Sequence, residues 1–115
     1  MASIAIAWPV LPGKLKTWRQ LCAALQGERR EEYAASSRRL GTITCRLFYQ
    51  QTPDADLVIS YLEAADLGRL FAGMATSQDP YDVWFRAQML DIHGWDMTQP
   101  PAGPLPELVL EWQDR

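Results

Sequence analysis

His93 is the only histidine of the chain, so it is the only side chain whose ordinary pKa lies close to neutral pH. It could act as a general acid or base, or as a haem ligand, with Trp84 on the same predicted helix. A second interpretation is structural, because His93 directly precedes Gly94, where that helix is expected to end. A histidine there interacts with the free carbonyls and the negative end of the helix dipole. Both interpretations stay open at the level of sequence.

A second candidate site lies on the helix predicted for residues 14–40. Its first half repeats apolar residues every three or four positions, at Leu15, Trp18, Cys22 and Leu25. The same stripe continues into polar residues, at Arg29, Glu32, Tyr33 and Ser36. If these residues face a sheet, they give a mostly apolar pocket with a few convergent polar groups, the usual form of a small-molecule site. The alternative is a solvated helix face stabilised by charged pairs at helical spacing.

Aromatic residues elsewhere in the chain could complete such a pocket. Tyr49 and Tyr61 on predicted strands, and Trp84 on a later helix, would supply its walls. The predicted ligand-binding residues are therefore Arg29, Tyr33, Tyr49, Tyr61 and Trp84. If the protein is an enzyme, the candidates for proton transfer are His93, Tyr33 and Glu32.

The sequence predicts neither a metal site nor a cofactor. It contains no GxGxxG, Walker, GxSxG or HExxH motif. Asp91, His93 and Asp96 are close in sequence, but positions 91 and 93 point about 200° apart around a helix. Zinc requires four convergent ligands, which this spacing does not provide.

Composition narrows the possible classes of protein. The 115 residues suffice for one domain, predicted to span residues 1–115, and 48% of them are hydrophobic. A formal net charge of −3 argues against nucleic-acid binding. No apolar run approaches the roughly 18 residues that cross a bilayer, so no membrane association is predicted. The N-terminus lacks the charged region of a signal peptide, and Cys22 and Cys45 form no CxxC pair, which favours the cytoplasm.

The spacing of apolar residues predicts the elements that must position these side chains. Strands are expected at residues 3–10, 42–51, 56–63 and 107–112. Helices are expected at residues 14–40, 65–75 and 80–93, the last beginning at Asp79-Pro80 and ending at Gly94. The long helix would span about 39 Å and a strand only about 20 Å. Its second half must therefore overhang the sheet, bend near Gly27 or line a solvated region.

This order of elements predicts an α+β, ferredoxin-like βαββαβ fold, in which helices cover one face of a four-stranded antiparallel sheet. The helix-covered face is expected to carry Ile4, Ile6, Ile43, Leu47, Ile59 and Leu108. The opposite face is expected to carry Ala5, Ala7, Phe48, Val58, Leu62 and Val109. No element remains to cover that face, which predicts a two-fold homodimer through the sheet. The alternative is a face whose polar residues keep it in contact with solvent.

Three stretches carry a resemblance to a known superfamily, at residues 79–86, 92–94 and 103–112. Together with the order of elements, they resemble the dimeric α/β-barrel superfamily, which includes the antibiotic-biosynthesis-monooxygenase-like proteins, and a small bacterial family within it. The resemblance covers nearly the whole chain. It implies two sheets packed face to face in a dimer, with a pocket between sheet and helices in each subunit. Members include cofactor-independent oxygenases, haem-degrading enzymes and mutarotases, so the resemblance does not select a reaction.

Three functions therefore remain open. The first is a homodimer that binds a small, largely apolar or aromatic molecule between sheet and helices. The second is an enzyme, such as a cofactor-independent monooxygenase or an isomerase, which requires His93 and the polar helix residues to reach one cavity. The third is a structural or interaction dimer, which is favoured if the protein encloses no cavity.

Overall fold

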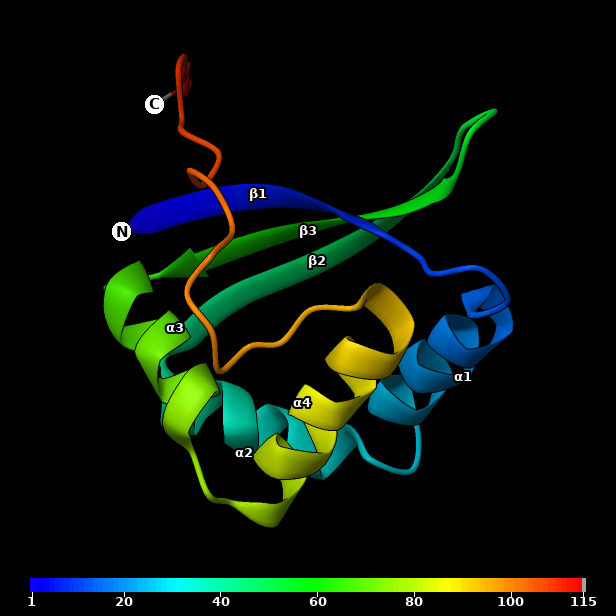
Figure 1. Cartoon of the computed structure of the whole chain (residues 1–115). Helices are drawn as coiled ribbons and strands as arrows, with labels where there is room; N and C mark the ends of the chain where they lie inside the picture. Colours follow the sequence, from blue (N-terminus) through cyan, green and yellow to red (C-terminus); the bar gives the residue numbers. More distant parts are fainter. Residues whose placement is uncertain (115) are drawn as a thin grey trace.

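The computed structural model describes residues 1–114 and contains three strands and four helices in that range (Figure 1). In chain order the elements are β1 (Ala2–Pro9), α1 (Leu15–Gln26), α2 (Arg30–Leu40), β2 (Thr42–Gln51), β3 (Asp56–Ala64), α3 (Leu67–Thr76) and α4 (Pro80–His93). The strands form one antiparallel sheet in the order β1-β3-β2. The helices all lie on one side of this sheet, and the other side is open (Figure 1).

The prediction of a four-stranded ferredoxin-like sheet is wrong. Residues 107–112 form no strand, and their side chains are exposed. Their alternating pattern fits a strand, but a strand also needs a sheet edge within reach. The proline-rich stretch before them leads the chain away from the sheet instead (Figure 1).

The helix predicted for residues 14–40 is divided at Gly27. The backbone N–H groups of Gly27 and Arg29 both donate to the carbonyl of Ala24, at 3.1 and 2.8 Å, which ends α1 before α2 begins. This confirms one of the three predicted solutions to the excess helix length, a bend near Gly27. The bend places the polar residues of α2 beside the sheet and not beyond its end (Figure 1). Gly41 then ends α2 with a φ of +91°, a conformation that glycine adopts without strain.

The predicted limits of α4 are confirmed. The Asp79 carboxylate accepts a hydrogen bond from the backbone N–H of Tyr81 at 2.9 Å, and Pro80 occupies the first turn. Gly94 ends the helix with a φ of +69°. These two ends fix where Tyr81 and His93 stand relative to the sheet.

The predicted faces of the sheet need correction on β2 and β3. An irregularity between Thr42 and Thr44 turns Ile43 outward, where it is exposed. On β3, Ser60 is paired with Ile6 of β1 and Leu47 of β2, and these three side chains point toward the helices. Val58 and Leu62 share this face with Ser60, so Ile59 lies on the open face, the reverse of the prediction. Apolar residues on both sides of β3 left its orientation undetermined until its register was known.

The hydrophobic core lies between the sheet and helices α1 and α4. Its buried members include Trp18, Leu21, Leu25, Val58, Met89 and Ile92. None of the helices found in residues 1–114 has the length and apolar character needed to cross a membrane.

Candidate functional site

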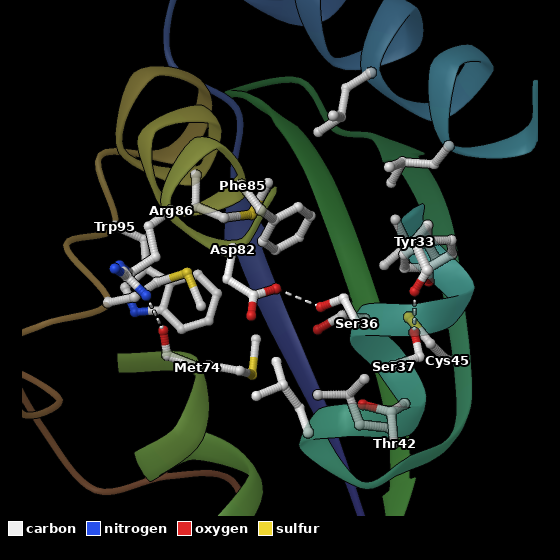
Figure 2. Close-up of a pocket in the computed structure, with 18 of the residues that line it drawn as sticks. Tyr33, Ser36, Ser37, Thr42, Cys45, Met74, Asp82, Phe85, Arg86 and Trp95 are labelled. Atoms are coloured by element: carbon white, nitrogen blue, oxygen red, sulfur yellow. Dashed lines mark hydrogen bonds between the residues drawn. The ribbon is translucent and has the colours of Figure 1, made fainter. Parts of the chain in front are cut away.

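A cavity of about 120 Å³ lies between the helix-covered face of the sheet and the helices (Figure 2). Most of its lining is apolar and comes from both layers, including Trp18, Leu25, Leu62, Phe71, Phe85 and Met89. Polar side chains also reach it, from α2, β2, β3 and α4. Figure 2 shows Tyr33 and Cys45 on one side of Asp82, with Met74, Arg86 and Trp95 on the other.

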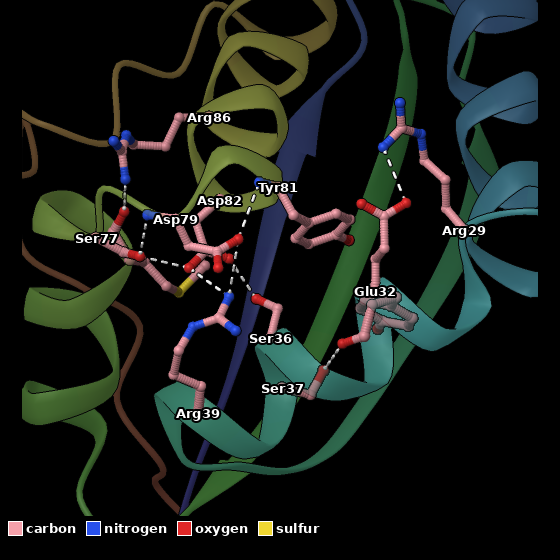
Figure 3. Close-up of polar contacts among 12 residues, drawn as sticks. Arg29, Glu32, Ser36, Ser37, Arg39, Ser77, Asp79, Tyr81, Asp82 and Arg86 are labelled. Atoms are coloured by element: carbon pink, nitrogen blue, oxygen red, sulfur yellow. Dashed lines mark hydrogen bonds and ion pairs between the residues drawn. The ribbon is translucent and has the colours of Figure 1, made fainter.

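The first polar region, which we call the Asp82 cluster, consists of Asp82, Ser36, Ser77 and Arg39 (Figure 3). Asp82 is only 4% exposed and accepts hydrogen bonds from both serine hydroxyls at 2.5 Å and from the Arg39 guanidinium at 2.8 Å. Burial alone would raise the pKa of Asp82, but these hydrogen bonds outweigh burial and hold its pKa below the usual value. The cluster joins α2, the α3–α4 connection and α4, and it is a structural cross-link.

The second polar region, which we call the tyrosine group, consists of Tyr33, Tyr81 and Cys45. All three line the cavity, and each affects the pKa of at least one of the others. Burial is the main reason that the pKa of each lies above its ordinary value. Tyr33 also interacts directly with the Cys45 thiol. At neutral pH the group is therefore uncharged and can donate hydrogen bonds.

Tyr81 differs from the other polar residues of the cavity. Its side chain is 6% exposed, and its hydroxyl has no hydrogen-bond partner among residues 1–114. The ring extends from α4 toward α2 and packs beside Trp84 and Phe85, at centroid distances of 5.5 and 6.2 Å (Figure 3). A buried hydroxyl without a partner carries a free-energy cost that a bound molecule could relieve.

His93 lies at another part of the cavity wall and is 7% exposed. Its Nδ1 is 2.8 Å from the carbonyl oxygen of Pro9. Because a carbonyl only accepts, Nδ1 carries the proton and Nε2 is the acceptor of the neutral ring. Burial lowers the pKa of His93, while the bond to Pro9 opposes this effect. Beside it, Trp8 and Trp95 are stacked with their centroids 4.0 Å apart.

The cavity brings together two of the predicted catalytic candidates, His93 and Tyr33. Glu32 is not part of its lining; it pairs with Arg29 at 3.2 Å, and its side chain is half exposed. Arg29 lies over the ring of Trp84, 4.0 Å from its centroid. Neither Arg29 nor Trp84 lines the cavity, although the ring of Trp84 packs against that of Tyr81.

The two predicted strand tyrosines also lie outside the cavity lining. The Tyr49 hydroxyl donates to Asp56 at 2.6 Å, and its ring packs against Trp18. Tyr61 points to the open face of the sheet, where Arg46 lies over its ring. Both positions follow from the register of β2 and β3, which the sequence pattern does not specify.

Several polar residues that line the cavity were not among the site residues predicted from the sequence: Ser37, Thr42, Cys45, Ser60, Tyr81, Asp82 and Arg86. A signal existed for Cys45, which alternates with Leu47 on the inward side of a correctly placed strand. Tyr81 and Asp82 stand in the first turn of a correctly placed helix, where nothing in the sequence indicates that they point inward.

Within the part of the chain that the structure describes, no three histidine, cysteine, aspartate or glutamate side chains are placed to hold a metal ion. Comparisons with protein-family models, curated proteins and solved structures gave no match to this chain. The resemblance to the dimeric α/β-barrel superfamily therefore stays a prediction.

Proposed function

We propose that this protein binds a small, largely apolar molecule with an aromatic ring in the cavity between sheet and helices. The observation that carries the proposal is the cavity itself, about 120 Å³ in volume and walled mainly by aliphatic and aromatic side chains. An apolar protein cavity of about 150 Å³ stays dry and binds benzene. The volume thus suits a single ring with few substituents.

The tyrosine group indicates one further property of the ligand. The unpartnered Tyr81 hydroxyl gains a hydrogen bond if the ligand carries a polar atom at that side of its ring. Since an unpaired buried hydroxyl costs about 1–3 kcal/mol, a phenol should bind more tightly than a purely hydrocarbon ring of the same size. A few fixed polar groups in an apolar pocket orient ligands in this way.

The test is the thermal stability of the protein in millimolar toluene and phenol. A ligand that binds only the folded state raises the melting temperature, because it stabilises that state by RT ln(1 + [L]/Kd). We expect both compounds to raise the melting temperature, phenol more than toluene. If neither does so at saturation of the aqueous phase, the proposal fails.

A matched pair of variants shows whether the compounds bind in this cavity. Leu47 lines the cavity, while its neighbour Phe48 points to the open face of the same strand. Leu47→Trp should reduce the cavity volume and abolish the stabilisation by both compounds. Phe48→Trp adds a similar bulk on the other face and should leave the stabilisation intact.

A second candidate function is proton transfer on a bound molecule. It is supported by the presence of His93 and Tyr33 in one cavity and by the free acceptor on His93 Nε2. The test is deuterium exchange into a bound C–H acid such as a small aryl ketone in heavy water. His93→Asn, which retains a donor for the Pro9 carbonyl, should abolish protein-catalysed exchange. Exchange at the uncatalysed rate in the native protein would contradict this second candidate.

A further inference from the structure

The helices of the protein are not attached to the core equally, and α2 is the weakly attached one. Helices α1, α3 and α4 each bury large apolar side chains, among them Leu21, Leu70 and Ile92. Of residues 30–40, all of which the structure describes, only Ser36 is buried, with 6% of its surface exposed. Hydrophobic stabilisation scales with the apolar area removed from water, so little of it holds α2 in place.

Helix α2 nevertheless forms one wall of the cavity. Four of its side chains belong to the lining: Tyr33, Ser36, Ser37 and Leu40. Tyr33 lies against Cys45 of β2 (Figure 2). The Tyr81 hydroxyl, on the neighbouring wall, is closed to solvent and has no partner among residues 1–114. A ligand can therefore bond to this hydroxyl only if part of the wall moves.

Polar contacts hold α2 where apolar contacts are few. The Ser36 hydroxyl donates to Asp82 Oδ1 at 2.5 Å, and the Arg39 guanidinium donates to Oδ2 at 2.8 Å. Arg39 also lies 3.4 Å from the Asp79 carboxylate. Figure 3 shows Ser36 and Arg39 pointing from α2 toward the start of α4. The Asp82 cluster is thus a single point of polar attachment near the C-terminal end of α2.

A glycine lies at each end of α2. Gly27 is in the connection from α1, where a Cβ atom would be only 3.0 Å from the Ala23 carbonyl oxygen. Gly41 ends the helix with a φ of +91°. Hinges are a few residues at element ends that absorb changes of φ and ψ, and glycine has the widest range of both.

We propose that α2 is the gate of the cavity, turning on Gly27 and Gly41 and held closed by the bonds from Ser36 and Arg39 to Asp82. Opening removes Tyr33 from Cys45 and uncovers the Tyr81 hydroxyl from the side of α2. The open state is a minor one, so the gate sets how fast a ligand enters and leaves and not how tightly it binds. Passage of a ligand rests on the proposed function, whereas opening itself needs no ligand.

The first experiment is amide hydrogen exchange of the full chain without ligand. Amides of α2 should exchange about tenfold or more faster than those of α4, and with little dependence on urea, because a local opening exposes little surface. Ser36→Ala should accelerate exchange in α2 about tenfold, since Asp82 loses one of its donors. Equal rates and equal urea dependence in the two helices would overturn the proposal.

Ser37→Ala is the matched control for Ser36→Ala. It makes the same substitution on the same helix, but Ser37 donates only to the carbonyl of Tyr33 within α2. Its exchange rates should change by less than about threefold. Arg39→Met and Arg38→Met repeat the comparison at two exposed residues of the last turn, and only Arg39→Met should accelerate exchange. Equal effects within either pair would contradict the assigned role of Asp82.

The second experiment measures the association and dissociation rates of phenol by NMR line shapes. Ser36→Ala should raise both rates about tenfold and leave the dissociation constant unchanged, because the open state stays a minor one. Phenol that binds the native protein and Ser36→Ala with equal rates would contradict the gate and leave the proposed function intact. If phenol does not bind, the proposed function fails, and hydrogen exchange still decides whether α2 opens.

Discussion

The two polar regions of the cavity differ in whether the hydrogen bonds of their buried groups are made within the protein. In the Asp82 cluster a nearly inaccessible carboxylate accepts from three donors and is fully compensated. In the tyrosine group the Tyr81 hydroxyl is buried to a similar extent and has no partner among residues 1–114. The comparison indicates that the first region stabilises the fold, while the second is available to a ligand.

The largest effect is expected in the Asp82 cluster. Asp82→Asn removes the charge that three donors bond to, and we expect it to reduce the free energy of unfolding by about 2–3 kcal/mol. Urea unfolding at neutral pH measures the loss. The control is Asp91→Asn on the same helix, whose carboxylate forms a surface ion pair with Lys14 and should contribute less than about 1 kcal/mol. Equal losses of stability in the two variants would show that the buried Asp82 carboxylate contributes no more than a surface carboxylate, which would contradict a stabilising role for the Asp82 cluster.

In the tyrosine group, removal of a polar group should increase the stability of the protein, the opposite of the effect expected for Asp82. Tyr81→Phe deletes a hydroxyl that has no partner, so the free energy of unfolding without ligand should rise by about 1 kcal/mol. The same variant should lose the preference for phenol over toluene while still binding both. Urea unfolding and ligand-induced melting shifts measure the two effects. A loss of stability instead would show that the hydroxyl is hydrogen-bonded in solution.

These two regions also show what the sequence could and could not predict. The ends of α4 were predictable because Asp79, Pro80 and Gly94 act locally on the backbone. The cavity position of Tyr33 was expected from helical spacing, and it required the bend at Gly27, which the sequence offered among three possibilities. The orientation of β3 was not predictable, because Val58 and Ile59 are both apolar and only strand pairing separates them.

The same limit explains the error at the C-terminus. Residues 107–112 have the alternation of a strand, yet alternation describes the segment and not its neighbour. Trp112 belongs to the strand expected at residues 107–112, and it is one of the most exposed side chains of the protein. Whether such a segment pairs, packs or projects depends on surfaces distant in the chain.

The smallest effect on stability is expected at His93. Like Asp82, its Nδ1 has a hydrogen-bond partner within the protein, the carbonyl of Pro9, whereas its Nε2, like the Tyr81 hydroxyl, is free to bond a ligand. Burial lowers its pKa in the folded protein, whereas the unfolded chain keeps a value near 6.5. Protonation therefore favours unfolding, and stability should fall as the pH decreases from about 6.5 through the pKa of the folded state. His93→Asn should flatten this dependence. Melting temperatures between pH 8 and pH 5 measure it.

The Asp82 carboxylate does not interfere with that measurement. Its pKa lies below the usual value of 3.8, so its contribution to stability is lost only in more acidic solution. An unchanged pH profile in His93→Asn would show that His93 is not the group responsible.

The placement of the tryptophans has a consequence for how this protein can be observed. Trp112, in the C-terminal segment of residues 107–112, is exposed to solvent. Trp18 is buried, and Trp8 and Trp95 are stacked beside the cavity. A soluble collisional quencher such as acrylamide should therefore extinguish one part of the intrinsic fluorescence much faster than the rest. If the quickly quenched fluorescence becomes protected, another molecule covers residues 107–112. A change in the slowly quenched fluorescence indicates a change at the cavity. The unlabelled protein thus carries separate fluorescent probes for its C-terminal segment and for its cavity.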